Sequence, residues 1–381
     1  MVKRLIEGEF PITCTGCCLI CDDIELSQDS GGALIIKNAC QVCHDDLIGW
    51  YSTTQSTLST SDIAPEIEKA NSILAAANLP LVCGLTDQSV ETQQAAVELA
   101  RRCNAAIDWT NGHWPFAFQD ALQDTGLVSC TFGEIKERAD LVIYWSCTDV
   151  NPAFTRRFVQ DTKTIRIDWD QTKQATAIRF LRQHPSDTEV DWEVDGDQEL
   201  TELKQAIDSA IYPVIVIDDA AAETLGESGV LSMVRFVRAQ NARNHCRLVH
   251  YSARQNVTGI QSTLSALAAG PYGVTFRNGK PMFRNREFTT ESLLGKGLVD
   301  ALVLIGSPAQ LPDIDLPKGM PVIWFSDGVL ENFAADVTIP FSRWGMDCDG
   351  TGYRDDGVPV FRKQVFERLL PTSIEVLGEV G

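Results

Sequence analysis

Seven apolar runs, each separated from the next by a stretch with helical spacing, are the feature that most constrains the fold of this chain. Such runs lack the alternation of a half-buried strand, so they predict strands covered on both faces. Helical spacing in between, as at 91–103 and 229–239, predicts a βα order and a doubly wound parallel sheet. The predicted strands are 79–85, 139–145, 162–169, 212–218, 246–251, 300–306 and 320–326.

The chain is too long for one core of ordinary size. Its 381 residues predict two or three units. The polar and acidic stretch 185–199 has few aliphatic residues and is predicted to connect two α/β units.

The charge balance limits the possible partners. Acidic residues outnumber basic ones 52 to 32, giving a net charge of −20. A chain this acidic repels phosphate backbones and anionic lipid surfaces, so neither nucleic acid nor a membrane is expected as a partner. No signal peptide or membrane-spanning run is evident, and we expect a cytoplasmic protein. In that compartment the twelve cysteines favour metal ligands or buried thiols over disulfides.

Six of the cysteines lie between Cys14 and Cys43. The pattern Cys14-x2-Cys17-x3-Cys21, followed by Cys40, supplies the four soft thiolates that an iron–sulfur cubane needs. A zinc site uses the same ligands, and a loop that has lost its metal keeps the same spacing. Spacing alone leaves three substitute ligands open: Cys18, Cys43 and His44.

Four stretches carry a family resemblance over almost the whole chain. They are CTGCCLICDDIEL (14–26), the segment 111–147 that begins NGHWPF, the segment 256–281 that begins NVTGIQS, and the segment 335–360 that contains DCDGTGYRDDGVPV. Together they resemble the B subunit of formylmethanofuran dehydrogenase, in the molybdopterin oxidoreductase superfamily, including its paralogue in the formyltransferase/hydrolase complex of methylotrophic bacteria.

The resemblance implies a molybdopterin-oxidoreductase-like α/β fold that lacks the C-terminal barrel domain. Doubly wound parallel sheets are then expected in two α/β domains, beside a small cysteine-rich domain. The corresponding boundaries are 1–55 for the cysteine-rich domain, 56–185 and 200–345 for the α/β domains, and 346–381 for a C-terminal segment that packs back on the N-terminal half.

One position departs from the family pattern. In active members, a cysteine or selenocysteine before a His-Gly-Pro stretch completes the coordination of tungsten or molybdenum on two pterin-guanine dinucleotides. Here the segment reads Asn111-Gly112-His113-Trp114-Pro115, so Gly112 stands at the thiolate position. Trp114 also adds bulk where the cofactor and substrate need space. The resemblance thus implies that the metal ligand is lost and the pterin cofactor absent.

The resemblance also implies vestigial cofactor-binding positions. His113 and Arg254 match polar active-site positions, and Asp168 opens the segment 168–172, where related enzymes hold a guanine. Asp168 can equally cap the next helix. A shift in sequence could bring another local cysteine to the metal, but each candidate also has an ordinary structural explanation: Cys103, Cys130 and Cys147.

The chain shows no independent hydrolytic motif. The signatures Gly-x-Ser-x-Gly and His-Glu-x-x-His are missing. Three of its five histidines are expected to be surface or packing residues: His184, His245 and His250. The acidic stretch 349–356 is interpreted either as a former cofactor loop or as a solvated turn.

Two functional hypotheses follow from the resemblance. The first is a non-redox scaffold subunit of a formyltransferase/hydrolase complex in methanopterin-linked oxidation of formaldehyde to formate. Its partners would be an amidohydrolase-like A-type subunit, a C-type subunit and a formyltransferase. The alternative is a redox-active B-type subunit that interconverts carbon dioxide with formate or formylmethanofuran at tungsten or molybdenum. An iron–sulfur cluster kept without a pterin is a mixed outcome.

Overall fold

The computed structural model describes residues 5–6, 11–52, 63–110, 114–183, 197–284, 286–327 and 333–381. The chain folds into two compact units. The first comprises Met1–Asn111, Arg254–Arg354 and Pro359–Gly381, and the second comprises Gly112–Ala253 and Asp355–Val358.

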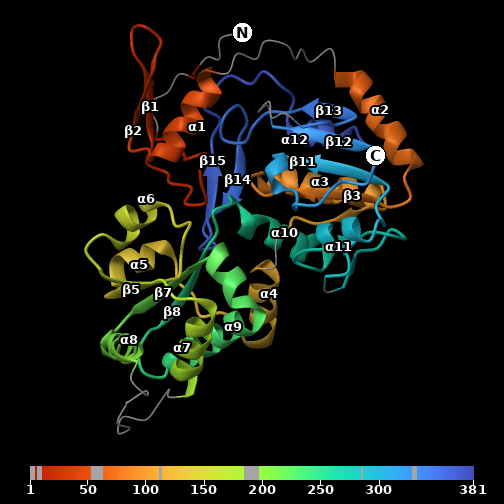
Figure 1. Cartoon of the computed structure of the whole chain (residues 1–381). Coiled ribbons are helices and arrows are strands. Elements are labelled where there is room, and N and C mark those ends of the chain that lie inside the picture. Colours follow the sequence, from red (N-terminus) through yellow and green to blue (C-terminus); the bar gives the residue numbers. More distant parts are fainter. Residues whose placement is uncertain are drawn as a thin grey trace. The chain divides into compact units, whose positions relative to one another are not determined.

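The first unit is built on a seven-stranded sheet in the order β10-β9-β4-β3-β11-β12-β13 (Figure 1). Strands β4, β3, β11, β12 and β13 are parallel, whereas β9 and β10 add an antiparallel edge. The bounds are β3 Pro80–Gly84, β4 Ala106–Ile107, β9 Val274–Thr275, β10 Met282–Phe283, β11 Ala301–Ile305, β12 Val322–Ser326 and β13 Val337–Pro340.

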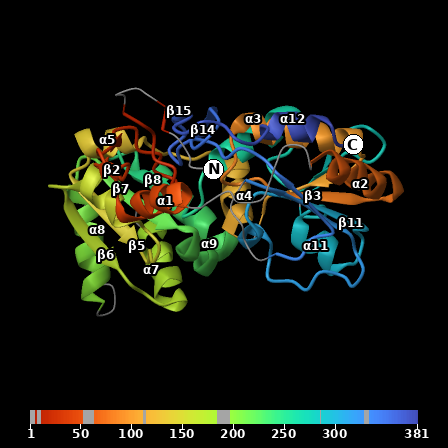
Figure 2. The same ribbon diagram turned by 90° about the horizontal axis from the view of Figure 1, so that it is seen from above.

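Helices cover both faces of this sheet. Figure 2 shows α3 (Val90–Arg102) and α12 (Ser373–Gly378) on one side of β3 and β11, and α11 (Thr290–Gly295) on the other. Leu293 of α11 belongs to one buried cluster with Leu81 and Leu302 of the sheet. Because both faces are covered, every residue of β3, β11 and β12 is buried. Also in this unit are α1 (Gln41–Ser52), α2 (Ile63–Ala76), α10 (Val257–Ala268) and the 3₁₀ turn η3 (Pro308–Gln310).

The second unit holds a four-stranded parallel sheet in the order β6-β5-β7-β8. Its strands are β5 Leu141–Trp145, β6 Lys163–Ile167, β7 Pro213–Asp218 and β8 Arg247–Tyr251. Helix α9 packs against both α4 and α7. The helical segments are α4 Trp114–Thr125, α5 Phe132–Arg138, α6 Pro152–Phe154, the π-helical turn η2 Thr155–Val159, α7 Gln171–Gln183, α8 Gln198–Ser209 and α9 Asp219–Gln240.

Two small antiparallel pairs complete the described fold. Strands β1 (Glu25–Gln28) and β2 (Leu34–Lys37) form one hairpin, and β14 (Gly350–Tyr353) pairs with β15 (Pro359–Arg362). All four strands belong to the first unit, which also carries the cysteine-rich loop. The C-terminal part of the chain returns to the beginning: Leu5 forms a bridge with Phe366, and the Ile6 N–H donates to the Val365 carbonyl at 2.9 Å.

All seven apolar runs form strands in parallel sheets, which confirms the predicted α/β class. The division of the chain differs from the two consecutive α/β domains expected over 56–185 and 200–345. Strand β3 pairs with β11, more than two hundred residues later, because both are fully buried and share one core. Nothing in the sequence indicated the short strands β4, β9 and β10. Most of the expected connection 185–199 lies outside the described residues.

In each sheet the strand order reverses at one place. In the first unit the reversal lies between β3 and β11: the chain continues from β3 to its neighbour β4 on one side, and from β11 to its neighbour β12 on the other. In the second unit it lies between β5 and β7, whose outer neighbours are β6 and β8. Ligands of doubly wound folds bind beyond the carboxyl ends of the strands at such a reversal. The segments after β3, β11, β5 and β7 are therefore where a cofactor site should be sought.

The β3 end is tightly constrained. Gly84 has φ +89°, and a Cβ at this position would lie 2.3 Å from the Ile305 carbonyl oxygen. We predict that Gly84→Ala lowers the free energy of unfolding by more than about 2 kcal/mol, because backbone of the neighbouring strand cannot move aside cheaply. Gly297→Ala is the matched control: its φ is +60°, but nothing lies within 4 Å, so it should cost about 1 kcal/mol. Urea denaturation measures both, and equal losses would contradict the steric argument.

Candidate functional site: the cysteine cluster and the two sheet reversals

The loop that carries the first three predicted ligands is closed by backbone hydrogen bonds. The Cys14 N–H donates to the Cys21 carbonyl at 2.6 Å, and Ile12 forms a bridge with Ile24 just outside the loop. Ile20 adopts φ +42°, a strained conformation for a β-branched residue, while its N–H donates to the Cys17 carbonyl at 3.3 Å. The loop thereby turns back on itself with its cysteines inside.

Gly16 lets this loop approach α1. A Cβ on Gly16 would lie 2.8 Å from the Cys43 nitrogen and 2.9 Å from its Cα. The first turn of α1 holds Cys43, and Cys40 immediately precedes the helix. The Thr15 hydroxyl also donates to Asp46 of α1 at 2.7 Å. Close backbone packing therefore brings the loop cysteines to the N-terminal end of a helix, where thiolates are favoured.

Four thiols meet at this contact. The Cys14 thiol interacts with Cys17, Cys40 and Cys43, and Cys17 also interacts with Cys18. Hydrogen bonds from Cys17, Cys40 and Cys43 hold the pKa of Cys14 well below its usual value, whereas the Cys14 contact and burial raise the pKa values of Cys17 and Cys43. The Gly16 N–H donates to the Cys14 sulfur at 3.4 Å. Buried cysteine sulfurs gathered in this way are the donor type that soft metals prefer.

The structure thus unites three of the four predicted ligands, Cys14, Cys17 and Cys40, and adds Cys43. Cys21 is buried in the same loop. His44 is exposed and lies 3.3 Å from Asp45. None of the twelve cysteines forms a disulfide. Within the described ranges, no group of three or more His, Cys, Asp or Glu side chains already surrounds a metal position. The buried thiol donors fit an iron–sulfur cluster in kind, and the predicted quartet remains a prediction.

A polar network joins the cysteine loop to the β3 end of the sheet. Gln255 is nearly buried, and its Nε2 donates to the Thr15 carbonyl at 2.7 Å. Its backbone N–H donates to Asp87 Oδ1 at 2.9 Å, and its carbonyl accepts from the Asp87 N–H at 3.0 Å. Asp87 has φ +64°. Sequence reasoning missed Gln255, because no motif marks a residue that acts through both its backbone and its amide.

Arg254 lies near this network. Burial raises the pKa of Asp87, and the Gln255 N–H together with the charges of Arg343 and Arg254 opposes that rise. The predicted vestigial contact Arg254 is therefore placed by the carboxyl end of β3, at the reversal of the first sheet. Its partner in the prediction, His113, lies outside the described residues, as does Gly112, which the resemblance places at the thiolate position.

At the reversal of the second sheet, a carboxylate of the chain itself occupies the backbone amides. Asp218 ends β7, is fully buried, and accepts from the N–H groups of Thr148 and Asp149 at 2.6 and 2.8 Å. Its other oxygen accepts from the Ala221 N–H in the first turn of α9 at 2.8 Å. Such amides are the usual receptors for a dinucleotide phosphate. Here they are already satisfied, so this edge does not fit a phosphate of a pterin dinucleotide.

The predicted guanine contact Asp168 lies elsewhere. Its side chain is exposed in the segment after β6. It does not cap α7, because Asp170 does so: Asp170 Oδ1 accepts from the Lys173 N–H at 2.8 Å. The capping alternative weighed for Asp168 is therefore wrong, and the capping residue lies two positions later.

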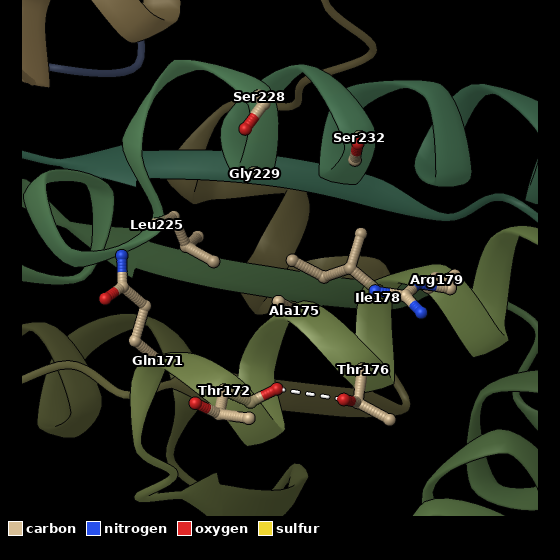
Figure 3. Close-up of a pocket in the computed structure, with 10 residues that line it drawn as sticks. All are labelled: Gln171, Thr172, Ala175, Thr176, Ile178, Arg179, Leu225, Ser228, Gly229 and Ser232. Atoms are coloured by element: carbon tan, nitrogen blue, oxygen red, sulfur yellow. Dashed lines mark hydrogen bonds between the residues drawn. The ribbon is translucent and has the colours of Figure 1, made fainter.

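A cavity of about 750 Å³ lies between α7 and α9 (Figure 3). Gln171 and Thr172, from the end of the segment 168–172, line it together with Arg179, Leu225 and Ser232. Figure 3 shows that these side chains come from two helices that face each other across the opening. Neither Asp168 nor any cysteine is among its lining residues.

The three alternative cysteines have no sign of ligand chemistry. Burial, followed by the nearby charge of Asp218, raises the pKa of Cys147 to about 12, and its thiol donates to the Val216 carbonyl at 3.1 Å. Burial and the Glu134 charge raise the pKa of Cys130 to about 12. Burial also raises the pKa of Cys103. Cys130 is buried and Cys103 and Cys147 are partly buried, and thiols whose pKa values are raised in this way are typical of packing residues.

The remaining predicted residues have structural contacts. Trp114 is buried at the start of α4, and its ring lies 4.8 Å from that of His250. His250 Nε2 lies 2.8 Å from Asp219 Oδ1, and His245 lies near Tyr212, with 6.2 Å between the rings. His184 lies outside the described residues.

The acidic stretch 349–356 forms specific hydrogen bonds. Asp355 accepts from the Ser252 N–H and Asp356 from the Phe132 N–H, both at 2.6 Å. These two carboxylates hold backbone of the second unit, to which both belong. Of the two interpretations offered for this stretch, the solvated turn does not describe these two residues.

Comparison with known proteins identifies the relatives of this chain. No protein-family model matches it. The B subunit of the tungsten-containing formylmethanofuran dehydrogenase 2 of Methanocaldococcus jannaschii is 24% identical over 415 residues, covering 93% of each protein. The protein of the same name from Methanococcus maripaludis is 22% identical over 407 residues, again covering 93% of each. This chain is a relative of the formylmethanofuran dehydrogenase B subunits. The resemblance inferred from the sequence motifs is thereby confirmed.

A solved structure supports the fold of this B-subunit relative. The formyltransferase/hydrolase complex from Methylorubrum extorquens, crystallised with methylofuran, contains a chain that matches with a TM-score of 0.66 at 19% identity. The match covers 84% of this chain and 94% of the other. At this level of identity the likeness concerns the fold. None of the helices in the described part of the chain combines the length and hydrophobicity of a membrane span.

The contact between Gly16 and α1 gives a direct test of the cysteine cluster. We predict that Gly16→Ala increases the rate at which native protein reacts with a thiol reagent by about tenfold or more, because the added methyl pushes the loop from Cys43 and exposes Cys14 and Cys17. Gly49→Ala, within α1 itself, has nothing within 4 Å and should leave the rate unchanged. Equal reactivity of the two variants would contradict the packing described.

Two aspartates that follow strands of the second sheet allow a test of the structural role of Asp218 with a matched control. Asp218→Ala should lower the free energy of unfolding by about 3 kcal/mol, because three backbone N–H groups lose their charged acceptor. Asp168→Ala changes an exposed side chain and should alter stability by less than about 0.5 kcal/mol. Both values come from equilibrium unfolding of the isolated chain in guanidinium chloride. A larger loss at Asp168 than at Asp218 would argue against the structural role of Asp218.

Proposed function

We propose that this chain is a non-redox scaffold subunit of a formyltransferase/hydrolase complex in methanopterin-linked one-carbon metabolism, on the route from formaldehyde to formate. Its partners would be an amidohydrolase-like A-type subunit, a C-type subunit and a formyltransferase, and the chemistry would belong to those partners. The observation that carries the proposal is the occupation of the second sheet's phosphate-receptor amides by Asp218.

Three further features support this proposal. Gly112 stands where active relatives have a metal-binding thiolate, and glycine has no side chain to offer. The alternative thiols of Cys130 and Cys147 are held neutral by burial. Trp114 is buried, and its ring lies 4.8 Å from that of His250. A chain with these properties can keep the fold of the dehydrogenase B subunit as a surface for assembly without binding its pterin cofactor.

We also propose that the cysteine cluster holds one four-iron, four-sulfur cluster through Cys14, Cys17, Cys21 and Cys40, with Cys43 as a neighbouring thiol. When bound, such a cluster supplies one-electron transfer or structural cross-linking. In a scaffold protein its contribution is structural: it ties the loop to the start of α1. The residues of this chain position and bury the thiols, and hydrogen bonds from backbone N–H groups reach their sulfurs.

The alternative function, a redox-active B-type subunit of a tungsten or molybdenum formylmethanofuran dehydrogenase, is favoured by a separate observation. Both sequence relatives reported above bear the name of tungsten-containing dehydrogenase subunits, and this chain keeps a cysteine set suited to electron transfer. This alternative requires a metal ligand in place of the missing thiolate.

Metal analysis of the protein, purified under anaerobic conditions with its partners, separates these functions. We predict about four iron and about four sulfide per chain, with tungsten, molybdenum and extractable pterin all below about a tenth of the iron-based stoichiometry. Zinc in place of iron would contradict the cluster assignment alone. Stoichiometric tungsten or molybdenum with a guanine dinucleotide pterin would overturn the scaffold function.

A further inference from the structure

Arg362, at the end of β15, is an arginine with an unusual setting. It is 1% exposed, and its guanidinium carbon lies 3.8 Å from the centre of the buried Trp344 ring. Its Nη2 donates to Gln255 Oε1 at 2.8 Å. A stacked and hydrogen-bonded guanidinium is held in one orientation, which a flexible surface arginine is not.

Among the residues that the structure describes, this buried cation has no adjacent carboxylate of the kind that such a group normally requires. In the described part of the chain, no Asp or Glu oxygen lies within 4 Å of its nitrogens, and its Nε has no hydrogen-bond partner. Arg343, which is 19% exposed, has carboxylate partners instead: it pairs with Asp46 at 2.9 Å and Asp327 at 3.8 Å. An isolated buried charge is costly unless an opposite charge is close. The negative group that balances Arg362 must therefore come from elsewhere.

The cysteine loop is the neighbour that can supply it. Gln255 connects the two directly, because it accepts from Arg362 and donates to the Thr15 carbonyl between Cys14 and Gly16. A Cβ built on Gly345 would lie 2.9 Å from Arg362 Cδ and 3.1 Å from Thr15 Cγ2, so both side chains border the same point.

The charges around Arg362 agree with this placement. Burial lowers the pKa of Arg362 to about 10, and the largest effect that opposes this comes from the charge of Cys14. Asp46 and Cys17 act in the same direction, but Asp46 already pairs with Arg343, whose own positive charge lowers the pKa of Arg362 further. Among the described groups that act on this arginine, Cys14 and Cys17 of the loop are thus the ones without a cationic partner of their own in the pairs described above.

We propose that Arg362 is the internal counter-charge of the cysteine cluster, a fixed cation that balances the negative charge of metal-bound thiolates. This inference rests on the proposed iron–sulfur cluster. A cluster ligated by four thiolates carries net negative charge, and its one-electron reduction adds another. A buried cation stabilises both states and the reduced state more, because the interaction grows with the charge of the cluster. Arg362 therefore raises the reduction potential of the cluster and helps to retain it.

The test compares anaerobically purified full-length wild type with Arg362→Met, which removes the charge at similar length. The dithionite-reduced cluster is followed by electron paramagnetic resonance in a redox titration, and iron per chain is measured alongside. We expect the reduction equilibrium of Arg362→Met to shift about tenfold or more toward the oxidised cluster, about 59 mV for one electron. Iron should fall to about half of the wild-type content or less after equal dialysis.

Two further variants separate charge from packing. Arg362→Lys keeps a buried cation and should recover most of the wild-type potential. Arg368→Met removes an exposed arginine that lies 3.8 Å from Glu375 and should leave potential and iron content unchanged. If Arg362→Met fails to fold, Gln255→Glu keeps the arginine but places a carboxylate beside it, and the same shift toward the oxidised cluster is expected.

The same measurements distinguish a failure of the role of Arg362 from a failure of the cluster assignment. A wild-type cluster whose potential and retention are unchanged by Arg362→Met, or by Gln255→Glu, overturns the role of Arg362 and leaves the cluster assignment standing. A wild-type chain without iron overturns the cluster assignment and this inference together. The scaffold function is decided separately, by the tungsten, molybdenum and pterin content of the complex.

Discussion

Hydrogen bonds from backbone N–H groups to carboxylates hold both sheets of this protein at the points where their strands begin or end. Asp108 follows β4, is fully buried, and accepts from the N–H groups of Gly273 and Thr290 at 2.9 and 2.7 Å. Asp300 accepts from the backbone just before β3, and Asp140 from the backbone just before β7. Charged acceptors make stronger hydrogen bonds than neutral ones, and here they fix the connections between strands and helices.

The same interaction explains part of the acidic composition. The chain has 52 acidic and 32 basic residues. If every carboxylate faced water, this imbalance would contribute only to the charge of the surface. Several instead accept hydrogen bonds from backbone N–H groups inside the fold. Asp218 is the clearest case, because its carboxylate lies on amides that a phosphate would otherwise bind. The fold of a cofactor-binding family is thereby compatible with a site that needs no cofactor to satisfy its backbone.

In the first unit, charge has the opposite distribution around the cysteines. Two arginines lie by the loop, the buried Arg362 and the partly exposed Arg343, and among the described residues only Arg343 is paired with carboxylates. Gln255 ties the loop, Arg362 and the β3 end into one network. A bound cluster would stabilise the loop that holds it, so such a network can have a structural role whether or not the chain performs redox chemistry.

The sequence by itself determined the α/β class, the seven main strands and the family, because continuous apolar runs and motif order are local properties of the chain. Its cysteine spacing predicts a cluster site at Cys14, Cys17, Cys21 and Cys40, which remains a prediction, and the structure brings Cys14, Cys17 and Cys40 together. The sequence could not show that β3 pairs with β11, since strand order depends on packing between distant segments. Asp218, Gln255 and Arg362 were equally invisible, because nothing in their sequence neighbourhoods distinguishes an exposed polar side chain from one buried against a distant backbone. Only the tertiary structure decided which polar groups meet. It placed the Asp218 carboxylate on the backbone amides of the second sheet and the Arg362 guanidinium beside the cysteine loop.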